Sequence, residues 1–280
     1  MKKYYVLYNP QAFGGRGKEE AELLDVAYYG EALIYFDLTE IDDYARFFEE
    51  IDEKGVVVIC GGDGTLQRFL NDTKNLSVKQ EIYYFACGRN NDFFRDVEGR
   101  QDRPVSLTNY IKNLPTVTVR GKERNFLNGV GFGLDGYCHE EEEKIFSRGG
   151  RADRKAIANK GLFGRYRPTD ATVTVDGNEF FFKKVWLAPT LNGKYYGGGM
   201  CAAPKQDRDK DGVMLMLVHG CGRLKTLFLF PKIWKGTHVK EKKYVTFLTG
   251  KTITVRFNEP RTLQIDGEIL TSVREYTVKK

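Results

Sequence analysis

The chain has 280 residues, of which 41% are hydrophobic and 13% aromatic, and this composition excludes an intrinsically disordered protein. The longest unbroken apolar run covers only residues 213–218, and the first apolar run is too short for a signal peptide, so neither a membrane span nor a leader is expected. The five cysteines form no CxxC pair, which favours a reduced, cytoplasmic setting.

Residues 1–114 alternate between strand-like and helix-like segments. The strand-like segments are short and almost wholly apolar, and such strands, buried on both faces and joined by helices, are typical of a parallel α/β sheet. We expect strands at Tyr4–Tyr8, Ala32–Phe36, Val56–Cys60 and Ile82–Cys87, and helices at Glu19–Tyr28 and Ile41–Glu53.

From residue 115 onward, apolar and polar residues alternate, which is typical of antiparallel strands. Asp176-Gly177 and Asp266-Gly267 lie where hairpin turns are expected. The alternation covers residues 116–120, 171–182, 251–257 and 261–270. The sequence therefore predicts an α/β domain over 1–114 and a β domain over 115–280.

The charge divides at the same place. Residues 1–114 carry 14 Lys and Arg against 20 Asp and Glu, a net charge of −6, whereas residues 115–280 carry 30 against 18, a net charge of +12. A strongly basic half favours an acidic partner or surface.

One strand of the first half runs directly into a glycine-rich loop, VVICGGDGTL. In open α/β sheets, ligands bind at the carboxyl ends of the strands, and bare glycine backbone lets N–H groups approach phosphate oxygens. A carboxylate in such a loop would repel phosphate unless it binds Mg²⁺ or accepts a proton. The alternative is a tight turn in which Asp63 only caps the following helix.

Two other strand ends carry similar groups. Asn9-Pro10 leads into the glycine-rich segment 12–18, and the fourth expected strand ends in Gly88-Arg89-Asn90-Asn91-Asp92-Phe93. Three strand ends that each combine glycine with a polar side chain favour a binding site over three unrelated turns.

The order NP…GG, GGDGT, GxxNDF resembles the catalytic domain of the diacylglycerol kinase family, especially its soluble bacterial lipid kinases. The NAD kinases share the GGDG loop. The resemblance continues through segments 126–135, 192–204, 211–212 and 264–268, so it covers most of the chain. It implies an N-terminal Rossmann-like parallel-sheet domain and a C-terminal antiparallel β-sandwich, with the active site in the cleft between them.

The resemblance also implies roles for individual residues. Asp63 would organise Mg²⁺ and phosphate, and Glu268 would be the general base on the lipid hydroxyl. Asp135 and Asp211, with Val213 beside the latter, would belong to the carboxylate–water–metal network. ATP would be held by Asn9, Thr39, Gly61, Gly62, Asp63, Gly64, Thr65, Gly88, Arg89, Asn91 and Asp92.

Three departures from the family pattern bear on activity. Arg89 stands where the family usually has Thr or Ser, Gln67-Arg68 replaces Asn-Glu, and the first loop is one residue longer. Arg89 could bind phosphate through a bidentate fork, or it could mark a weakened catalyst. We interpret Arg68 as a solvated helix residue.

Two acidic stretches have simpler interpretations than their composition suggests. Segment 207–212 reproduces the first half of a calcium loop, but the twelfth position is Val218 rather than Glu, which argues against an EF-hand. The family resemblance, in which the matching loop holds a structural Mg²⁺, instead implies a bound cation at Asp211. The run Glu140–Glu143 after His139 is typical of a solvated acidic surface.

Three functions compete on this evidence: an ATP-dependent lipid kinase, a non-catalytic nucleotide- or lipid-binding regulator, and a kinase for a soluble substrate. The presence of Asp63 and Glu268 and the basic β half favour the first. We then expect a lipid substrate at an anionic membrane surface, no nucleic-acid partner, and docking through the basic, aromatic-containing stretches 148–167 or 223–243. The sequence leaves a homodimer open.

Overall fold

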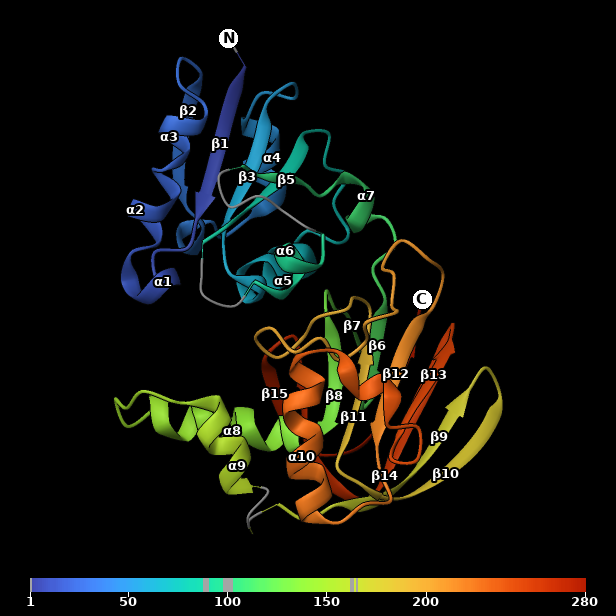
Figure 1. Ribbon diagram of the computed structural model, residues 1–280. Coiled ribbons are helices and arrows are strands. Elements are labelled where there is room, and N and C mark those ends of the chain that lie inside the picture. Colours follow the sequence, from blue (N-terminus) through green and yellow to red (C-terminus); the bar gives the residue numbers. More distant parts are fainter. Residues whose placement is uncertain (1, 88–90, 98–102, 162–163, 165) are drawn as a thin grey trace. The chain divides into compact units, whose positions relative to one another are not determined.

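The structure, a computed structural model, describes residues 2–87, 91–97, 103–161, 164 and 166–280 (Figure 1). The chain divides into two compact units, Met1–Leu114 and Pro115–Lys280. Among the described residues, no helix combines the length and the apolar character needed to cross a membrane.

The first unit is built on a five-stranded sheet in the order β2-β1-β3-β4-β5. The first four strands are parallel, as expected, while the short β5 pairs antiparallel with β4 and was not predicted. The strands are β1 (Lys3–Tyr8), β2 (Ala32–Asp37), β3 (Val56–Gly61), β4 (Glu81–Ala86) and β5 (Val105–Ser106). The helices are α1 (Ala12–Gly15), α2 (Gly17–Ala21), α3 (Leu24–Ala27), α4 (Tyr44–Glu50), α5 (Asp63–Asp72), α6 (Asp92–Asp96) and α7 (Thr108–Ile111), with a 3-10 turn η1 (Leu38–Glu40).

The single helix predicted over Glu19–Tyr28 is wrong, because the chain forms α2 and α3 with a turn between them. Around this turn, backbone N–H groups donate to the carbonyl three residues earlier: Leu23 N–H donates to Glu20 O, and Val26 N–H donates to Leu23 O. This tighter winding places Ala21 and Leu24, three residues apart, into the core together.

The second predicted helix is confirmed but shorter. The Asp43 carboxylate caps its start by accepting the N–H groups of Ala45 and Arg46. Phe47 and Phe48 are its buried residues.

The second unit is a ten-stranded antiparallel sheet system. Its long strand β14 pairs with β9 through Ile253–Phe257 and with β8 through Leu263–Ile265, so one strand takes part in two layers. The strands are β6 (Thr116–Val119), β7 (Lys122–Asn125), β8 (Gly129–Gly133), β9 (Thr169–Val175), β10 (Asn178–Val185), β11 (Leu187–Leu191), β12 (Val213–Val218), β13 (Val245–Gly250), β14 (Thr252–Ile265) and β15 (Glu268–Lys279). The expected segments 251–257 and 261–270 are thus not two separate strands: β14 runs unbroken through the first and most of the second, and β15 begins at Glu268.

Both predicted hairpin turns are confirmed. Asp176 and Gly177 have φ of 46° and 86°, and Asp266 and Gly267 have φ of 47° and 97°, the left-handed pair that two-residue hairpins need. Three helices of this unit were not predicted: α8 (Leu134–Phe146), α9 (Arg154–Lys160) and α10 (Arg223–Trp234), the last followed by a 3-10 turn η3 (Thr237–Lys240).

Candidate active site

The carboxyl ends of four parallel strands lie level at one edge of the first sheet. Tyr8, the last residue of β1, pairs with Asp37 of β2 and with Cys60 of β3, and Gly61 pairs with Ala86 of β4. The loops that follow these strands therefore start at the same edge, which is where ligands bind in open α/β sheets.

Asp63 joins two of these loops. It is the first residue of α5, and its carboxylate accepts the backbone N–H groups of Asp92 at 2.6 Å and Phe93 at 3.3 Å, which open α6. Asp63 thus caps the helix of the neighbouring loop rather than its own helix. The carboxylates of Asp63 and Asp92 belong to adjacent loops, and such hard oxygen donors suit Mg²⁺.

Asn9 joins the third loop to the same place. Its Nδ2 donates to Thr65 Oγ1 at 2.9 Å, and its Oδ1 accepts the N–H of Gln11 at 3.0 Å. Its backbone N–H donates to Cys60 O at 3.2 Å, so the side chain and the main chain both contact the β3 segment. The structure brings together Asn9, Asp63, Thr65, Asn91 and Asp92.

Tyr84, which the sequence analysis missed, lies beneath these loops. Its hydroxyl is 3.0 Å from Gly61 O and 3.3 Å from Asn91 Oδ1. Burial, with a smaller contribution from the Asp63 charge, raises the pKa of Tyr84 well above its ordinary value, so the phenol stays neutral and able to donate. A tyrosine inside an otherwise apolar buried strand was the available signal.

The glycines of the loop are not equivalent. A Cβ at Gly61 would lie 2.6 Å from Thr65 Cβ, and one at Gly17 would lie 1.8 Å from Asn9 O. A Cβ at Gly64 would meet nothing within 4 Å. Two glycines thus allow close packing of the loops, while Gly64 borders open space at the N-terminus of α5, where anions are favoured.

Thr39 follows β2 at the same sheet edge, but its described contacts are local. Its N–H and hydroxyl both donate to the Asp37 carboxylate, at 2.8 and 2.7 Å. It lines a pocket of about 540 Å³ that also includes Tyr44, Arg68 and Asp72. Arg68 is exposed and pairs with Asp72 at 3.7 Å, which confirms it as a solvated helix residue. Gly88 and Arg89 lie outside the described residues.

In the second unit, the predicted base Glu268 opens β15. It is exposed, and the Arg124 guanidinium contacts its carboxylate at 2.5 Å. Two residues earlier, the Asp266 carboxylate accepts three backbone N–H groups, from Leu127, Asn128 and Gly129, at 2.5–2.9 Å. Asp266 therefore holds the Glu268 hairpin against the segment 126–129.

The backbones of the expected metal residues lie at different places in the second unit. Asp211 is exposed and pairs with Lys251 at 3.2 Å, and Val213 is buried at the start of β12. Asp135, whose side chain lies outside the described part, follows the Gly133 end of β8, whereas strand register places Met214 and its loop at the Gly129 end. Four residue steps of strand separate these ends, about 13 Å at roughly 3.3 Å per step.

The expectation that Asp135 and Asp211 join one carboxylate–water–metal network stays a prediction; strand register places their backbones at opposite ends of β8, so water rather than one shared ion would link them. Within the described residues, no group of three His, Cys, Asp or Glu side chains is close enough to hold a metal ion. A site at Asp63 and Asp92 would take its remaining ligands from nucleotide phosphates and water, as Mg²⁺ sites commonly do.

Two known family models match this chain. Residues 3–120 match the family model of the diacylglycerol kinase catalytic domain, and residues 128–277 match that of the YegS C-terminal NAD kinase beta sandwich-like domain. The chain belongs to the diacylglycerol kinase family. This membership confirms the resemblance seen in the sequence and makes the protein a phosphotransferase of the lipid kinase type.

Individual relatives are distant. A diacylglycerol kinase of Bacillus subtilis (strain 168) is 22% identical over 280 residues, covering 96% of this chain and 90% of that protein. A diacylglycerol kinase of Mycobacterium tuberculosis (strain H37Rv) is 27% identical over 207 residues, covering 71% of this chain and 66% of that protein. The crystal structure of a diacylglycerol kinase from Bacillus anthracis str. Sterne matches with a TM-score of 0.62 and 18% identity, covering 100% of this chain and 94% of that one, which supports the fold.

Proposed function

We propose that the protein transfers the γ-phosphoryl group of ATP to the hydroxyl group of diacylglycerol or a related lipid, giving phosphatidic acid or its analogue. The observation that carries the proposal is the meeting of three strand-end loops around Asp63, with Asn9, Thr65, Asn91 and Asp92. Phosphoryl transfer needs chiefly positioning and charge neutralisation, and loops fixed to one another by hydrogen bonds supply the positioning.

In this proposal the first unit binds the nucleotide. The open space at Gly64 and the N-terminus of α5 would receive phosphate oxygens, and Thr39 would contact the nucleotide from the end of β2. Asp63 and Asp92 would hold Mg²⁺, which neutralises charge on the phosphates when it is bound. The Asp92 and Phe93 N–H groups keep the Asp63 carboxylate fixed in one orientation.

The second unit would supply the base. Glu268 accepts the proton of the lipid hydroxyl as that oxygen attacks phosphorus, and the Arg124 contact fixes the carboxylate until the substrate arrives. Asp211 would hold a cation in the loop before β12.

The direct test is a phosphotransfer assay with labelled ATP, Mg²⁺ and a panel of lipids in mixed micelles, including diacylglycerol. Incorporation of label into lipid is expected. Transfer to a soluble acceptor such as NAD would instead support a kinase for a soluble substrate. This alternative is motivated by the GGDG loop, which the NAD kinases share, and by the NAD kinase-like second domain.

The regulator alternative rests on Arg89 and is tested separately by nucleotide binding. If Arg89 binds phosphate, Arg89→Ala weakens ATP binding by about 1.5–3 kcal/mol, the range for hydrogen bonds to charged groups. Arg89→Thr, the residue usual in the family, should then retain or raise transfer. A parent protein that binds no ATP at millimolar concentration with Mg²⁺ would contradict the kinase proposal.

A further inference from the structure

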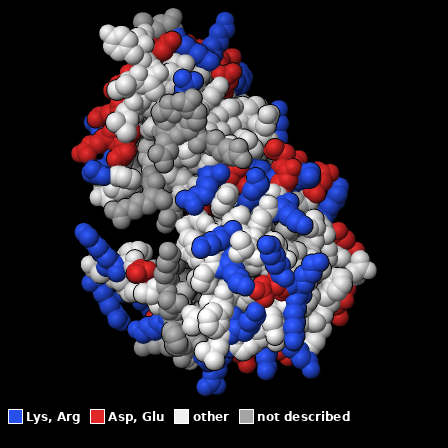
Figure 2. All heavy atoms as spheres, viewed as in Figure 1, with Lys and Arg blue, Asp and Glu red and all other residues white. Residues whose placement is uncertain are grey.

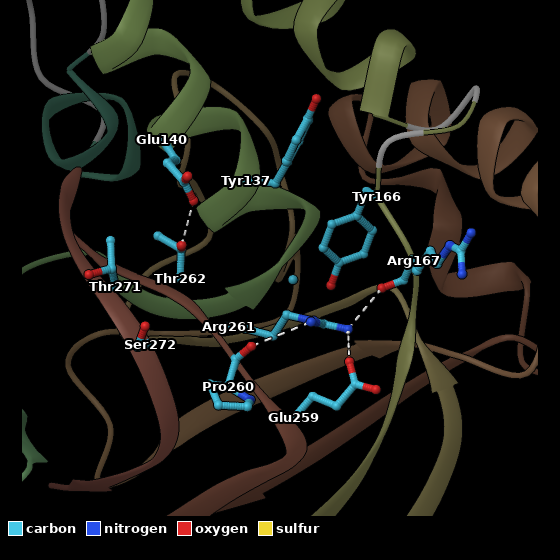
Figure 3. Close-up of a pocket in the computed structure, with 11 residues that line it drawn as sticks. Tyr137, Glu140, Tyr166, Arg167, Glu259, Pro260, Arg261, Thr262, Thr271 and Ser272 are labelled. Carbon is cyan, nitrogen blue, oxygen red and sulfur yellow. Dashed lines mark hydrogen bonds and ion pairs between the residues drawn. The ribbon is translucent and has the colours of Figure 1, made fainter.

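A second cavity lies wholly within the second unit. It has a volume of about 570 Å³ and is lined by α8, by residues 166–167 before β9, and by the β14–β15 ladder (Figure 3). This size is within the range of small-molecule sites. The proposed transfer reaction assigns no role to its lining residues, which are Gly133, Tyr137, Glu140, Tyr166, Arg167, Glu259, Pro260, Arg261, Thr262, Thr271 and Ser272.

The cavity forms where the β14–β15 ladder is interrupted. Arg261 pairs with Val273 and Leu263 pairs with Leu270, so the single residue Thr262 faces two residues, Thr271 and Ser272. Such a bulge redirects side chains and is frequent beside functional sites. Here all three bulge residues carry hydroxyl groups and line the cavity.

The bulge is strained and is held in place. Ser272 has φ of 56°, a left-handed conformation that costs a non-glycine residue energy. The Arg120 Nη2 atom donates to the carbonyl oxygens of both Thr271 and Ser272 at 2.7 Å. This conformation is therefore stabilised from outside the cavity while the hydroxyl-bearing residues border it.

Two buried polar atoms at the cavity, Tyr166 Oη and Arg261 Nε, form no hydrogen bond of normal geometry with the described residues; the Arg261 guanidinium lies beside Tyr166 and opposes the burial that raises the pKa of its hydroxyl, but this contact satisfies neither atom fully. Tyr166 is only 5% exposed, and its hydroxyl points across the cavity toward Arg261 (Figure 3). Buried polar groups are almost always satisfied in folded proteins, so these two indicate a site for a ligand or water that brings its own donors and acceptors.

Both carboxylates that line the cavity already have partners. Glu140 accepts from Thr262 Oγ1 at 2.7 Å and from Lys144 Nζ at 2.8 Å, and Glu259 accepts from Arg261 Nη2 at 2.7 Å. Glu140 is thus more than the solvated acidic surface residue that the sequence suggested. An anion would meet two carboxylates, and a cation would meet the Arg261 guanidinium.

A hydrocarbon chain fits no better, because it would cover Tyr166 Oη and Arg261 Nε without satisfying them. What suits the lining is a neutral group that both donates and accepts hydrogen bonds and has C–H faces for the rings of Tyr137 and Tyr166. We propose that this cavity binds a neutral polyhydroxyl group, either a free polyol or sugar, or the hydroxylated head group of a lipid.

The first experiment is saturation-transfer NMR on the full chain with three free probes at millimolar concentration: glycerol, myo-inositol and glucose. A parallel arm compares micelles of a diacylglycerol that carries one hexose with micelles of plain diacylglycerol. Saturation transfer to a free probe supports the proposal and identifies a free polyol or sugar as the ligand. Saturation transfer only to the hexose of the lipid also supports the proposal and identifies a lipid head group as the ligand. Neither measurement needs kinase activity, so failure here leaves the proposed reaction untouched.

Two substitutions tie the binding to this cavity. Tyr166→Phe removes only the hydroxyl and should weaken polyol binding about 2- to 12-fold, the loss of one hydrogen bond, without lowering the unfolding temperature. Ser272→Gly should weaken binding similarly while raising the unfolding temperature, because glycine relieves the left-handed strain. Substitution of a residue with a purely structural role would not combine weaker polyol binding with an unchanged or raised unfolding temperature.

The matched controls lie elsewhere. Tyr29→Phe alters a tyrosine that is 94% exposed in the first unit, and Lys184→Gly relieves a left-handed residue, φ 51°, in β10. Both should leave polyol binding unchanged. The proposal is overturned if no polyol binds in either arm, if Tyr166→Phe and Ser272→Gly bind as the parent does, or if inorganic phosphate displaces the polyol.

Discussion

Asp63 and Asp266 both accept backbone N–H groups from a distant loop, but their surroundings differ. Asp266 accepts three such groups, and burial raises the pKa of its carboxyl against the opposing effect of those hydrogen bonds. Asp63 accepts two and lies half-buried at the edge of the sheet, beside the open space at Gly64. The first arrangement suits a structural role and the second suits contact with a ligand.

This difference predicts opposite consequences for the same substitution. Asp63→Asn should lower phosphoryl transfer by about two or more orders of magnitude, because it removes the charge that organises metal and phosphate. Its loss of unfolding free energy should be smaller than that of Asp266→Asn, because Asp63 is only half-buried and accepts two N–H groups instead of three. Asp266→Asn should lower the unfolding free energy by about 1.5–3 kcal/mol, since it loses hydrogen bonds to a charged acceptor. Initial rates and urea unfolding measure the two effects. Equal stability losses in both variants would refute the distinction.

Glu268 can be tested against a closely matched residue on the same strand. Glu268 contacts Arg124 at 2.5 Å and Glu275 contacts Arg256 at 2.5 Å, both on β15. If Glu268 is the base, Glu268→Gln should lower transfer by about two orders of magnitude or more, as removal of a general base does. Glu275→Gln should transfer at near the parent rate. Similar rates for the two variants would remove Glu268 from the mechanism.

Substitutions at two glycines of the GGDG loop distinguish its role in packing from its role in binding ATP. Gly61→Ala places a methyl group 2.6 Å from Thr65 Cβ, so it should displace Thr65, break its hydrogen bond to Asn9 and destabilise the fold by about 1–3 kcal/mol. Gly64→Ala has free space and should gain up to about 1 kcal/mol from helix propensity, yet weaken ATP binding where phosphates are expected. Thermal unfolding and ATP titration read the two properties. Parent-like ATP affinity in Gly64→Ala would show that phosphates do not approach there.

At the scale of elements, α10 shows how a helix is fixed to its unit. Its buried face is formed by Thr226, Leu229 and Ile233 at helical spacing. The carboxylate of Glu241, which follows η3, contacts Lys225 Nζ at 2.9 Å and also Lys232 Nζ, which lies about two helical turns further along α10. These two contacts lower the pKa of Glu241 to about 2, so one carboxylate joins both ends of the helix to the following turn.

This arrangement predicts a pH dependence with a defined sign. The pKa of Glu241 falls from its ordinary 4.5 to about 2 on folding, so its stabilisation is complete above pH 4.5 and is lost as the pH falls toward 2. The parent should therefore be more stable than Glu241→Gln at pH 6, and the difference should shrink between about pH 4.5 and 2. Chemical unfolding across this range measures it, with Glu179→Gln on exposed β10 as control. A constant difference down to pH 2 would contradict the assignment.

At the scale of the whole molecule, the two units carry opposite net charge, −6 and +12. Figure 2 shows Lys and Arg side chains spread over the face of the second unit on which α10 lies in Figure 1. Within the stretch 148–167, Ile157 and Tyr166 are buried, and Leu162 and Phe163 lie outside the described residues. In the stretch 223–243, by contrast, Leu224 and Phe228 are each 70% exposed, one helical turn apart on α10.

We therefore propose the α10 face as the membrane-docking surface of a kinase whose substrate stays in the bilayer. Lys235, Lys240 and Lys242 are exposed beside it and should each contribute about 1 kcal/mol at an anionic surface. Binding to anionic vesicles should exceed binding to zwitterionic vesicles and should weaken with salt. Replacing the three lysines by glutamine should remove the salt-dependent part, measured by vesicle co-sedimentation.

The apolar part of the docking has its own control. The double variant Leu224→Ser/Phe228→Ser should weaken vesicle binding equally at low and high salt, because insertion of apolar side chains is not screened. Phe181→Ser, which changes a phenylalanine that is 57% exposed on β10, should not. Equal binding of the double variant and the parent would exclude α10 as the docking surface while leaving the kinase proposal standing.

The sequence by itself predicted the four parallel strands of the first unit, the change from parallel to antiparallel structure and both hairpin turns. These depend on local patterns: wholly apolar runs, two-residue alternation and Asp-Gly pairs. It also identified Asp63 and its neighbouring loops, because glycine beside a polar residue at three strand ends is visible without coordinates. The three helices of the second unit were not predicted from the sequence, and α10 shows the reason. It carries apolar residues on its exposed face as well as on its buried face, and Pro231 lies within it.

Only the tertiary structure decided which charged groups meet. Arg124 and Glu268 are 144 residues apart, and Arg120 reaches Thr271 across 151 residues, so no local pattern reports either contact. Strand register also placed the backbones of Asp135 and Asp211 at opposite ends of β8, which no local pattern reports. The cavity at the Thr262 bulge likewise exists because one extra residue in β15 opens the ladder, and pairing between distant strands, rather than sequence spacing, determines where that residue falls.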